Sequence, residues 1–366
     1  MMGDKIRVGL IFGGRSGEHE VSVVSASSIM QALDPEKYQV LPIGITKTGR
    51  WLPGVSPQML AAAGEREVKP GVEALAPAEL RFPLGNPDGR LLGELADRVD
   101  VVFPVLHGPF GEDGTIQGLL ELADLPYVGG GVLASALGMD KALMKMVFQQ
   151  VKLPIADFLV VLRRDWEQTP EEILARIEDC LGYPCFIKPA NLGSSVGISK
   201  ARDREQLKAA LTKAAAYDRK LVVEEFINGR EIECSVLGND DPIASVPGEI
   251  VPCAEFYDYE AKYILNDSKL LIPAELPATV TAEIREMAVR AFKAIDCAGL
   301  ARVDFFVTRE GNRVLVNEIN TIPGFTNISM YPKMWEATGI PYKELLDRLI
   351  ELAFERHSDR QRNRVS

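Results

Sequence analysis

The sequence contains few cysteines, no long apolar run and no surplus of basic residues. Its five cysteines form no C-x-x-C pair, which favours reduced thiols over a disulfide framework. No run reaches about 18 apolar residues, so we expect no membrane span, and the N-terminus lacks the pattern of a signal peptide. A formal net charge of −11 argues against a nucleic-acid partner, because phosphate backbones require clustered lysines and arginines. We therefore expect a cytoplasmic protein.

The glycine-rich segment FIKPANLGSSVGISK (residues 186–200) does not match the phosphate loop G-x-x-x-x-G-K-[ST]. Strand-like residues flank its glycines, which predicts a hairpin loop. Lys188 would project from the incoming strand, and the backbone N–H groups from Gly193 to Gly197 would form an anion-binding concavity. Such a hairpin can close over a ligand. An exposed turn rich in small residues remains the alternative from this segment alone.

The length of 366 residues and the order of patterns indicate two or three domains, α/β first and α+β later. Predicted strands at 5–12, 38–46 and 99–108 alternate with helices at 18–33 and 115–125, which is typical of a parallel sheet. After a helix over 134–150, β-branched alternation and hairpin turns predominate. Residues 51–95 read as an irregular insertion, and the charged tail 355–366 is expected to fray.

The segment ARVDFFVTREGNRVLVNEIN (residues 301–320) predicts a hairpin that opposes two carboxylates. With its turn centred on Gly311, Asp304 faces Glu318 and Arg302 faces Asn320, and all four share one face. Opposed like charges destabilise a sheet, and Asp, Glu and Asn supply the oxygen ligands that magnesium prefers. An exposed polar face on which Arg302 neutralises one acid is the alternative. The opposite face is expected to hold Val303, Phe305, Val307, Leu315 and Ile319.

A phosphate-binding hairpin followed by a magnesium-binding hairpin resembles the ATP-grasp fold. Between them, LVVEEFINGREIECSV (residues 221–236) is similar to the adenine-binding strand and hinge of that fold. The resemblance implies that Glu224 receives the adenine amino group and that Glu231 binds the ribose hydroxyls. Contacts to the edge of the adenine are implied for Glu225, Phe226 and Ile227.

Five further segments resemble the D-alanine–D-alanine ligase family, in that family's order. They are GGRSGEHEVS (13–22), HGPFGEDGTIQG (107–118), MDK (139–141), FYDYEAKY (256–263) and NEINTIPGFTNISMYP (317–332). Only the middle of the insertion and the tail lie outside the resemblance. It implies a Rossmann-like parallel α/β domain followed by a two-part ATP-grasp domain. The implied divisions are 1–140 for the N-terminal domain, 141–222 for the lid, 223–352 for the catalytic part and 353–366 for a flexible tail.

The family resemblance implies that ATP converts the carboxylate of one D-alanine into an acyl phosphate, which the amine of a second D-alanine attacks. The product, D-alanyl-D-alanine, serves peptidoglycan synthesis. Cations around the transferring phosphate are needed for this chemistry. Lys141 and Lys188 would contact the α- and β-phosphates, and Lys262 and Arg302 the γ-phosphoryl group. Two magnesium or manganese ions would be bound by Asp304, Glu318 and Asn320. Further ATP contacts are implied for Ser194, Ser195, Tyr257, Asn317 and Glu318.

On the amino-acid side, the resemblance implies that Glu18 binds the ammonium of the first D-alanine and that His107 lies beside its carboxylate. Ser329 would bind the second substrate's carboxylate. Ser194 and Tyr263 would form a hydrogen-bonded network with Glu18, and Tyr263 favours a dipeptide over an ester product. The tetrahedral intermediate would be stabilised by Arg302 and the N–H of Gly324. From the residues alone, Glu18 also fits a helix-start acid, and His107 a structural histidine.

Several alternatives remain at this stage. They are a D-alanine–D-lactate ligase, another ATP-grasp carboxylate–amine ligase, an inactive nucleotide-binding regulator and a small-molecule-binding module. Glu18, Tyr263 and Ser329 weigh against the first two. The intact cations and carboxylates weigh against the regulator, and a binding module leaves the opposed carboxylates unexplained. The expected partners are ATP, D-alanine and a second copy of the chain, with neither nucleic acid nor membrane.

Overall fold

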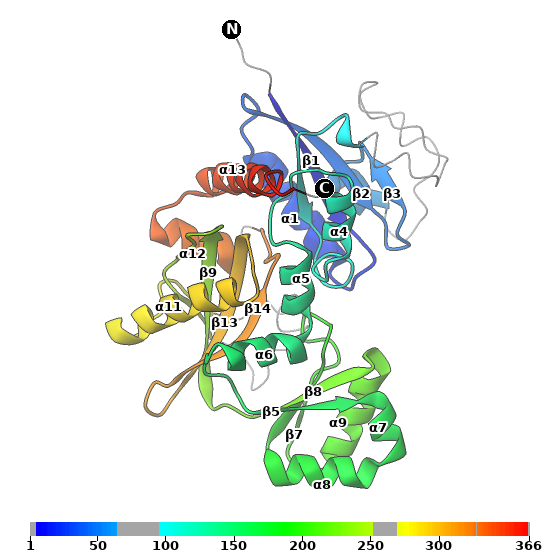
Figure 1. The fold of residues 1–366 in the computed structure, drawn as a ribbon, viewed down its shortest axis with the longest axis vertical. Helices are drawn as coiled ribbons and strands as arrows, with labels where there is room; N and C mark the ends of the chain where they lie inside the picture. The colour runs from blue at the N-terminus through cyan, green and yellow to red at the C-terminus, as the bar shows by residue number, and fades with distance from the viewer. Residues whose placement is uncertain (1–4, 64–94, 252–268, 327, 365–366) are drawn as a thin grey trace.

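The computed structural model describes residues 5–63, 95–251, 269–326 and 328–364 (Figure 1). The chain is a mixed α/β protein whose described part contains three sheets, stacked along the long axis of the molecule. None of the helices in these ranges is long and apolar enough to cross a membrane.

The first sheet contains the N-terminal strands and confirms the predicted parallel pattern. β1 pairs in parallel with β2 and β4, and the short β3 adds an antiparallel edge. β1 reads IRVGLIFG and is buried in all but its first two residues, as expected for a parallel strand covered on both faces. In spatial order the strands are β3 (Trp51–Pro53), β2 (Tyr38–Ile45), β1 (Ile6–Gly13) and β4 (Val101–Val105). The accompanying helices are α1 (His19–Ala32), α2 (Pro57–Ala63) and α4 (Thr115–Leu122).

The single helix expected over 134–150 is wrong, because two helices meet at Asp140. They are α5 (Val132–Met139) and α6 (Lys141–Gln150). Asp140 leaves the helical region at φ −84° and ψ 95°, and its side chain accepts hydrogen bonds from the N–H groups of Ala142 and Leu143. This is an N-cap, which the short polar side chain of Asp favours. The break makes Lys141 the first residue of α6.

The second sheet lies at the lower end of the molecule in Figure 1, with α7, α8 and α9 beside it. The predicted glycine-rich hairpin is confirmed, since β6 and β7 pair antiparallel around the loop 190–198. The expected boundary at 222/223 falls inside β8, which pairs with both β5 and β6 and so belongs wholly to this sheet. The strands are β5 (Phe158–Leu162), β8 (Lys220–Glu225), β6 (Cys185–Pro189) and β7 (Ser199–Ala201). The helices are α7 (Arg163–Gln168), α8 (Pro170–Cys180) and α9 (Arg204–Tyr217).

The third sheet, in the middle of the molecule, carries the carboxylate hairpin. One face of it packs on α11 (Ala278–Ala294) in a buried apolar cluster that includes Val303, Phe305 and Ile319. The spatial order is β12 (Lys269–Leu271), β11 (Gly248–Val251), β9 (Gly229–Gly238), β13 (Gly299–Thr308) and β14 (Val314–Asn320), with β10 (Ile243–Ala244) on β9.

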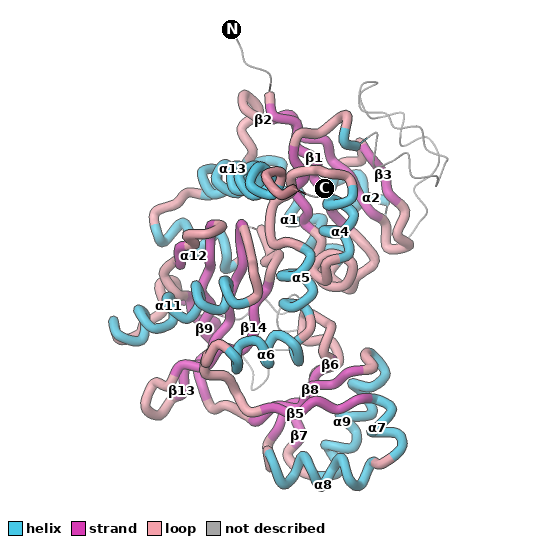
Figure 2. Tube along the Cα trace, in the orientation of Figure 1, coloured by secondary structure: helices cyan, strands magenta, loops and turns pink. Residues whose placement is uncertain are grey.

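The two ends of the chain share one core. α12 (Met330–Thr338) and α13 (Tyr342–Arg360) place Trp335 and Leu349 in the same buried cluster as Val8 and Phe103 of the first sheet. The prediction of a frayed tail from residue 355 is wrong up to Arg360, because α13 continues through it. Arg356 stacks on the Tyr127 ring at 4.1 Å. Figure 2 shows α13 lying beside the N-terminal part.

Candidate active site

The hairpin of β13 and β14 aligns its polar residues as predicted at one end and differs at the other. Arg302 pairs with Asn320, and Asp304 pairs with Glu318. Beyond that point a β-bulge shifts the register by one residue, so Phe305 pairs with Val316. The expected position of Leu315 on the core face is therefore wrong, since it pairs with Phe306 instead of facing α11. Bulges redirect side chains beside active sites, and here Asn317 and Glu318 both line one cavity.

Cations compensate the two opposed carboxylates. Arg302 donates from Nε and Nη2 to the two oxygens of Asp304, at 2.7 Å each. Its Nε also lies 3.1 Å from Glu233 on β9, while Lys141 lies 3.4 Å from Glu318. Burial opposes the charge of Arg302, but Asp304 and Glu233 hold its pKa well above the ordinary value. The neutralising role of Arg302 considered from the sequence is therefore present, beside the side-chain oxygens of Asp304, Glu318 and Asn320.

A first, small cavity of about 100 Å³ lies between the N-terminal part, the glycine-rich loop and the hairpin. Its lining brings together residues that are far apart in sequence and were predicted for substrate, phosphate and magnesium. They are Glu18, His107, Lys141, Ser194, Arg302, Glu318, Asn320 and Gly324.

Glu18 is enclosed by two glycine-containing loops. Ser194 Oγ donates a hydrogen bond to Glu18 Oε1, so the predicted link between the N-terminal part and the loop is present. A Cβ on Gly193 would lie 3.0 Å from Glu18 Oε2, and one on Gly108 would lie 2.8 Å from it. Gly108 also has φ +72°, which disfavours any other residue. These glycines leave room for a carboxylate that faces the cavity.

His107 and Glu112 hold the backbone of Ile322 from two sides. His107 Nδ1 lies 2.9 Å from the Ile322 carbonyl, which can only accept, so Nδ1 carries the proton. The Ile322 N–H donates to Glu112 Oε1 at 3.1 Å, and the Gly108 N–H donates to Glu112 Oε2 at 2.8 Å. Burial lowers the pKa of His107, and burial together with Glu18 raises the pKa of Glu112 to about 8. His107 Nε2 has no hydrogen-bond partner among the described residues and is available to a ligand.

A second, larger cavity of about 490 Å³ lies between the second and third sheets. Lys200 stacks on the Phe226 ring at 3.9 Å at one side, and Asp304 lies at another. Glu318 lines both this cavity and the small one, so the carboxylate face of the hairpin lies where they adjoin. The cavity gathers nine residues predicted for ATP: Lys188, Ser195, Glu224, Glu225, Phe226, Ile227, Glu231, Asn317 and Glu318.

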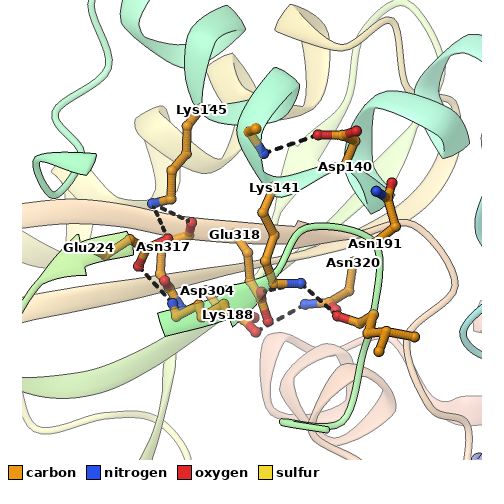
Figure 3. A network of polar contacts seen from close by, with 12 residues as sticks. Asp140, Lys141, Lys145, Lys188, Asn191, Glu224, Asp304, Asn317, Glu318 and Asn320 are labelled. Carbon is orange, nitrogen blue, oxygen red and sulfur yellow. Dashed lines mark hydrogen bonds and ion pairs between the residues drawn. The ribbon is translucent and has the colours of Figure 1, made fainter. Parts of the chain in front are cut away.

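Sequence reasoning missed Lys145, Glu112 and Glu233. Lys145 is buried, and its Nζ lies 3.3 Å from Glu224 Oε1 (Figure 3). The four-residue spacing of Lys141 and Lys145 places both on one face of a helix, which is a signal that could have found it. Glu233 follows Glu231 by two residues on a strand and thus shares its face.

Not every predicted site residue can be placed beside the cavities. Ser329 lines neither; its Oγ accepts from the Thr326 N–H at 3.0 Å and would lie 3.0 Å from a Cβ on Gly324. Tyr257, Lys262 and Tyr263 lie outside the described residues. Within the described ranges, no three His, Cys, Asp or Glu side chains lie close enough together to hold a metal ion. The magnesium ligands implied by the family resemblance are two carboxylates and one amide, so they do not form such a group.

Two solved ligase structures share this mixed α/β fold. A solved D-alanine–D-alanine ligase from Coxiella burnetii superposes with a TM-score of 0.81 at 41% identity, covering 98% of this chain and 97% of that one. A solved D-Ala:D-Ser ligase from Enterococcus faecalis also superposes with a TM-score of 0.81, at 37% identity, covering 96% of this chain and 100% of that one.

Sequence comparisons identify the family. The family descriptions "D-ala D-ala ligase N-terminus" and "D-ala D-ala ligase C-terminus" match residues 7–130 and 147–351. The D-alanine–D-alanine ligases of Ruminiclostridium cellulolyticum and Acetivibrio thermocellus are 56% and 54% identical, each covering 98% of both chains. The chain belongs to the D-alanine–D-alanine ligase family.

Proposed function

We propose that this protein uses ATP to join two D-alanine molecules into D-alanyl-D-alanine, for peptidoglycan precursor synthesis. Relatives that carry this activity in their names are more than half identical over nearly the whole chain. The observation that carries the proposal is the position of Glu318, at the carboxylate face that adjoins both cavities. A phosphoryl group held there by a nucleotide in the larger cavity can reach a small carboxylate in the other.

The small cavity fits a zwitterionic amino acid. Glu18 supplies a carboxylate for the ammonium group, and Arg302 supplies a cation for the carboxylate. With Nδ1 protonated and a lowered pKa, His107 presents an acceptor at Nε2, which also suits the ammonium. A contact between His107 and the substrate carboxylate requires the imidazolium form, so this part of the expected role depends on pH.

The larger cavity fits a nucleotide whose phosphates extend toward the hairpin. Lys141 and Lys188 approach from α6 and β6, and the loop bearing Ser194 and Ser195 supplies backbone N–H groups. Both serines have positive φ, 51° and 58°, so this loop does not follow an ordinary strand conformation. Each oxygen of Glu224 is paired with a lysine, Oε1 with Lys145 and Oε2 with Lys188. The contact expected between Glu224 and the adenine amino group would therefore have to share one of these oxygens with a lysine.

The donor set of the hairpin fits magnesium, because Asp304, Glu318 and Asn320 offer hard oxygen atoms on adjacent strands. Bound there, magnesium would neutralise charge on the transferring phosphoryl group. Asp304 is already held by Arg302 and by Asn320 Nδ2 at 3.0 Å, so a metal competes with these contacts for its oxygens. Once a metal takes the Asp304 oxygens, Arg302 would be free to contact the phosphoryl group. It would also help the Gly324 N–H to stabilise the oxyanion of the tetrahedral intermediate. Ser329 remains the proposed binding site for the carboxylate of the second D-alanine.

The finer architecture is part of this proposal. Residues 1–140 form a Rossmann-like domain, and the remainder forms a two-part ATP-grasp domain whose lid extends to Glu225, because β8 belongs to the lid sheet. Two magnesium ions and a homodimer are further expectations from the family. The relation to a D-Ala:D-Ser ligase makes D-serine an acceptor worth testing.

The testing experiment measures ADP formation and products by mass spectrometry. The purified protein is incubated with ATP, magnesium and D-alanine, with parallel samples containing L-alanine, or D-alanine plus excess D-lactate or D-serine. We expect D-alanyl-D-alanine as the main product, and no ligation of L-alanine. A dominant ester or mixed dipeptide would replace the proposed acceptor, and ADP formation independent of any amino acid would contradict a ligase.

A further inference from the structure

Lys145 is a buried cation that the predicted site residues leave unexplained. Its side chain is 1% exposed and points from α6 toward the junction of the second and third sheets (Figure 3). Nζ lies 3.3 Å from Glu224 Oε1 on β8 and 3.4 Å from the carbonyl oxygen of Asn317 on β14. Lys145 therefore touches both sheets that enclose the larger cavity.

Glu224 is shared between two lysines. Lys188 Nζ lies 2.7 Å from Glu224 Oε2, while Lys145 takes the other oxygen. Burial alone would raise the pKa of Glu224, but Lys145 and Lys188 lower it to about 2, so it stays ionised. Burial lowers the pKa of Lys145, and Glu224 and Glu318 oppose that shift. With both lysines protonated, the three groups carry one net positive charge, and the side chains of all three are at most 10% exposed. Glu318 and Glu231, further away, also favour the charged form of Lys188.

This sharing matters for Lys188, which lines the larger cavity whereas Lys145 does not. With Glu224 as its only partner, the Lys188 ammonium would form a neutral, closed pair. With Lys145 on the other oxygen, the charge of Glu224 is shared between two ammonium groups, so that of Lys188 is only partly cancelled. Lys188 also keeps two of its three N–H donors beyond the one it gives to Glu224. A net charge on this cluster also attracts phosphate within a poorly hydrated site.

We propose that Lys145 is a positioning residue for nucleotide phosphate: by neutralising Glu224 from behind, it keeps the charge and donors of Lys188 available in the larger cavity. The inference rests on the proposed function, in which that cavity holds ATP. The contact of Lys145 with the Asn317 carbonyl gives it a second role, because Asn317 is the bulged residue beside Glu318. The same ammonium thereby connects the lysine pair to the carboxylate face.

The first test replaces Lys145 by methionine, which keeps the unbranched stem and removes the charge. The matched control is Lys343→Met on the exposed side of α13, which changes the net charge equally. ATP binding is measured directly by calorimetry without D-alanine, and KM is measured for each substrate. We expect Lys145→Met to weaken ATP binding and raise KM for ATP by about tenfold or more, with a change of less than about twofold for D-alanine. The control should match the wild type.

The second test repeats the Lys145 substitution in a Glu224→Gln background. If Lys145 acts by neutralising Glu224, its removal should then change ATP binding far less than in the wild type, whatever Glu224 contributes to adenine. An equal loss in both backgrounds, or unchanged ATP binding in Lys145→Met, overturns the inference. Since calorimetry does not need turnover, these results are separate from the ligase assay: a wild type that binds ATP but forms no dipeptide refutes the proposed function alone.

Discussion

Replacing Asp304 by asparagine should destabilise the metal-free protein as well as abolish ligation. Sequence reasoning gives the opposite sign, because two opposed carboxylates without metal ought to repel one another. The structure shows why this fails for Asp304: Arg302 forms two bonds of 2.7 Å with it, and the two side chains are only 20% and 14% exposed. Asparagine keeps a single acceptor and no charge.

The size of the effect follows from these contacts. Removing one partner of a buried ion pair costs about 3–5 kcal/mol. Here Arg302 retains Glu233 at 3.1 Å and the pair is partly exposed, so we expect about 1–3 kcal/mol. At about 2–4 °C per kcal/mol for a large domain, the melting temperature should fall by roughly 2–12 °C. Glu318→Gln is the matched comparison: it loses the Lys141 contact at 3.4 Å but also relieves repulsion from Asp304, so its melting temperature should change by less than about 2 °C.

The assay is thermal unfolding in chelator, followed by ADP formation with excess magnesium. Both variants should lack turnover, and only Asp304→Asn should lose stability. An Asp304→Asn protein as stable as the wild type would mean that the Arg302 pair contributes nothing, and the electrostatic account of the hairpin would be wrong. Retained turnover at limiting magnesium in either variant would remove the metal assignment.

Three further predictions concern the small cavity. Glu18→Gln should raise KM for D-alanine far more than KM for ATP, since a charged hydrogen bond contributes about 1.5–3 kcal/mol; equal effects would indicate a structural role. Gly108→Ala should raise KM for D-alanine, because its Cβ would lie 2.8 Å from Glu18, whereas Gly311→Ala, with a similar positive φ in open space, should lose only stability. For Glu112, a pKa of about 8 means that its contribution to stability is fully present below its ordinary pKa of 4.5 and is lost as pH rises through 8. The melting temperature of the wild type should therefore fall more between pH 5 and 9 than that of Glu112→Gln, and parallel curves would contradict this.

Local patterns predicted the strands, the hairpins and the pairing of Asp304 with Glu318 because side-chain alternation and turn chemistry act over a few residues. The bulge at Asn317 could not be predicted, since an inserted residue preserves alternation on both sides and shows only in the pairing. The end of α5 was missed for a similar reason. Asp140 is tolerated within a helical pattern, and its capping role depends on a backbone angle that the sequence does not display.

Long-range packing explains the remaining errors. The tail after residue 355 is charged and lacks an apolar face of its own, but Arg356 and His357 contact Tyr127 and Asp124 more than 200 residues away. Lys145 reads as an ordinary helix-surface lysine until α6 packs between two sheets. Family resemblance supplied the roles of Glu18 and Arg302, which the spacing of residues alone left open.

The central claim is that a nucleotide and D-alanine meet at the carboxylate face of the hairpin. The most direct measurement is transfer of oxygen from D-alanine to phosphate, with D-alanine labelled by ¹⁸O in its carboxylate. If the carboxylate is phosphorylated and the second amine displaces phosphate, one ¹⁸O should appear in the released phosphate for each dipeptide formed. Phosphate without the label, at full dipeptide yield, would contradict the account.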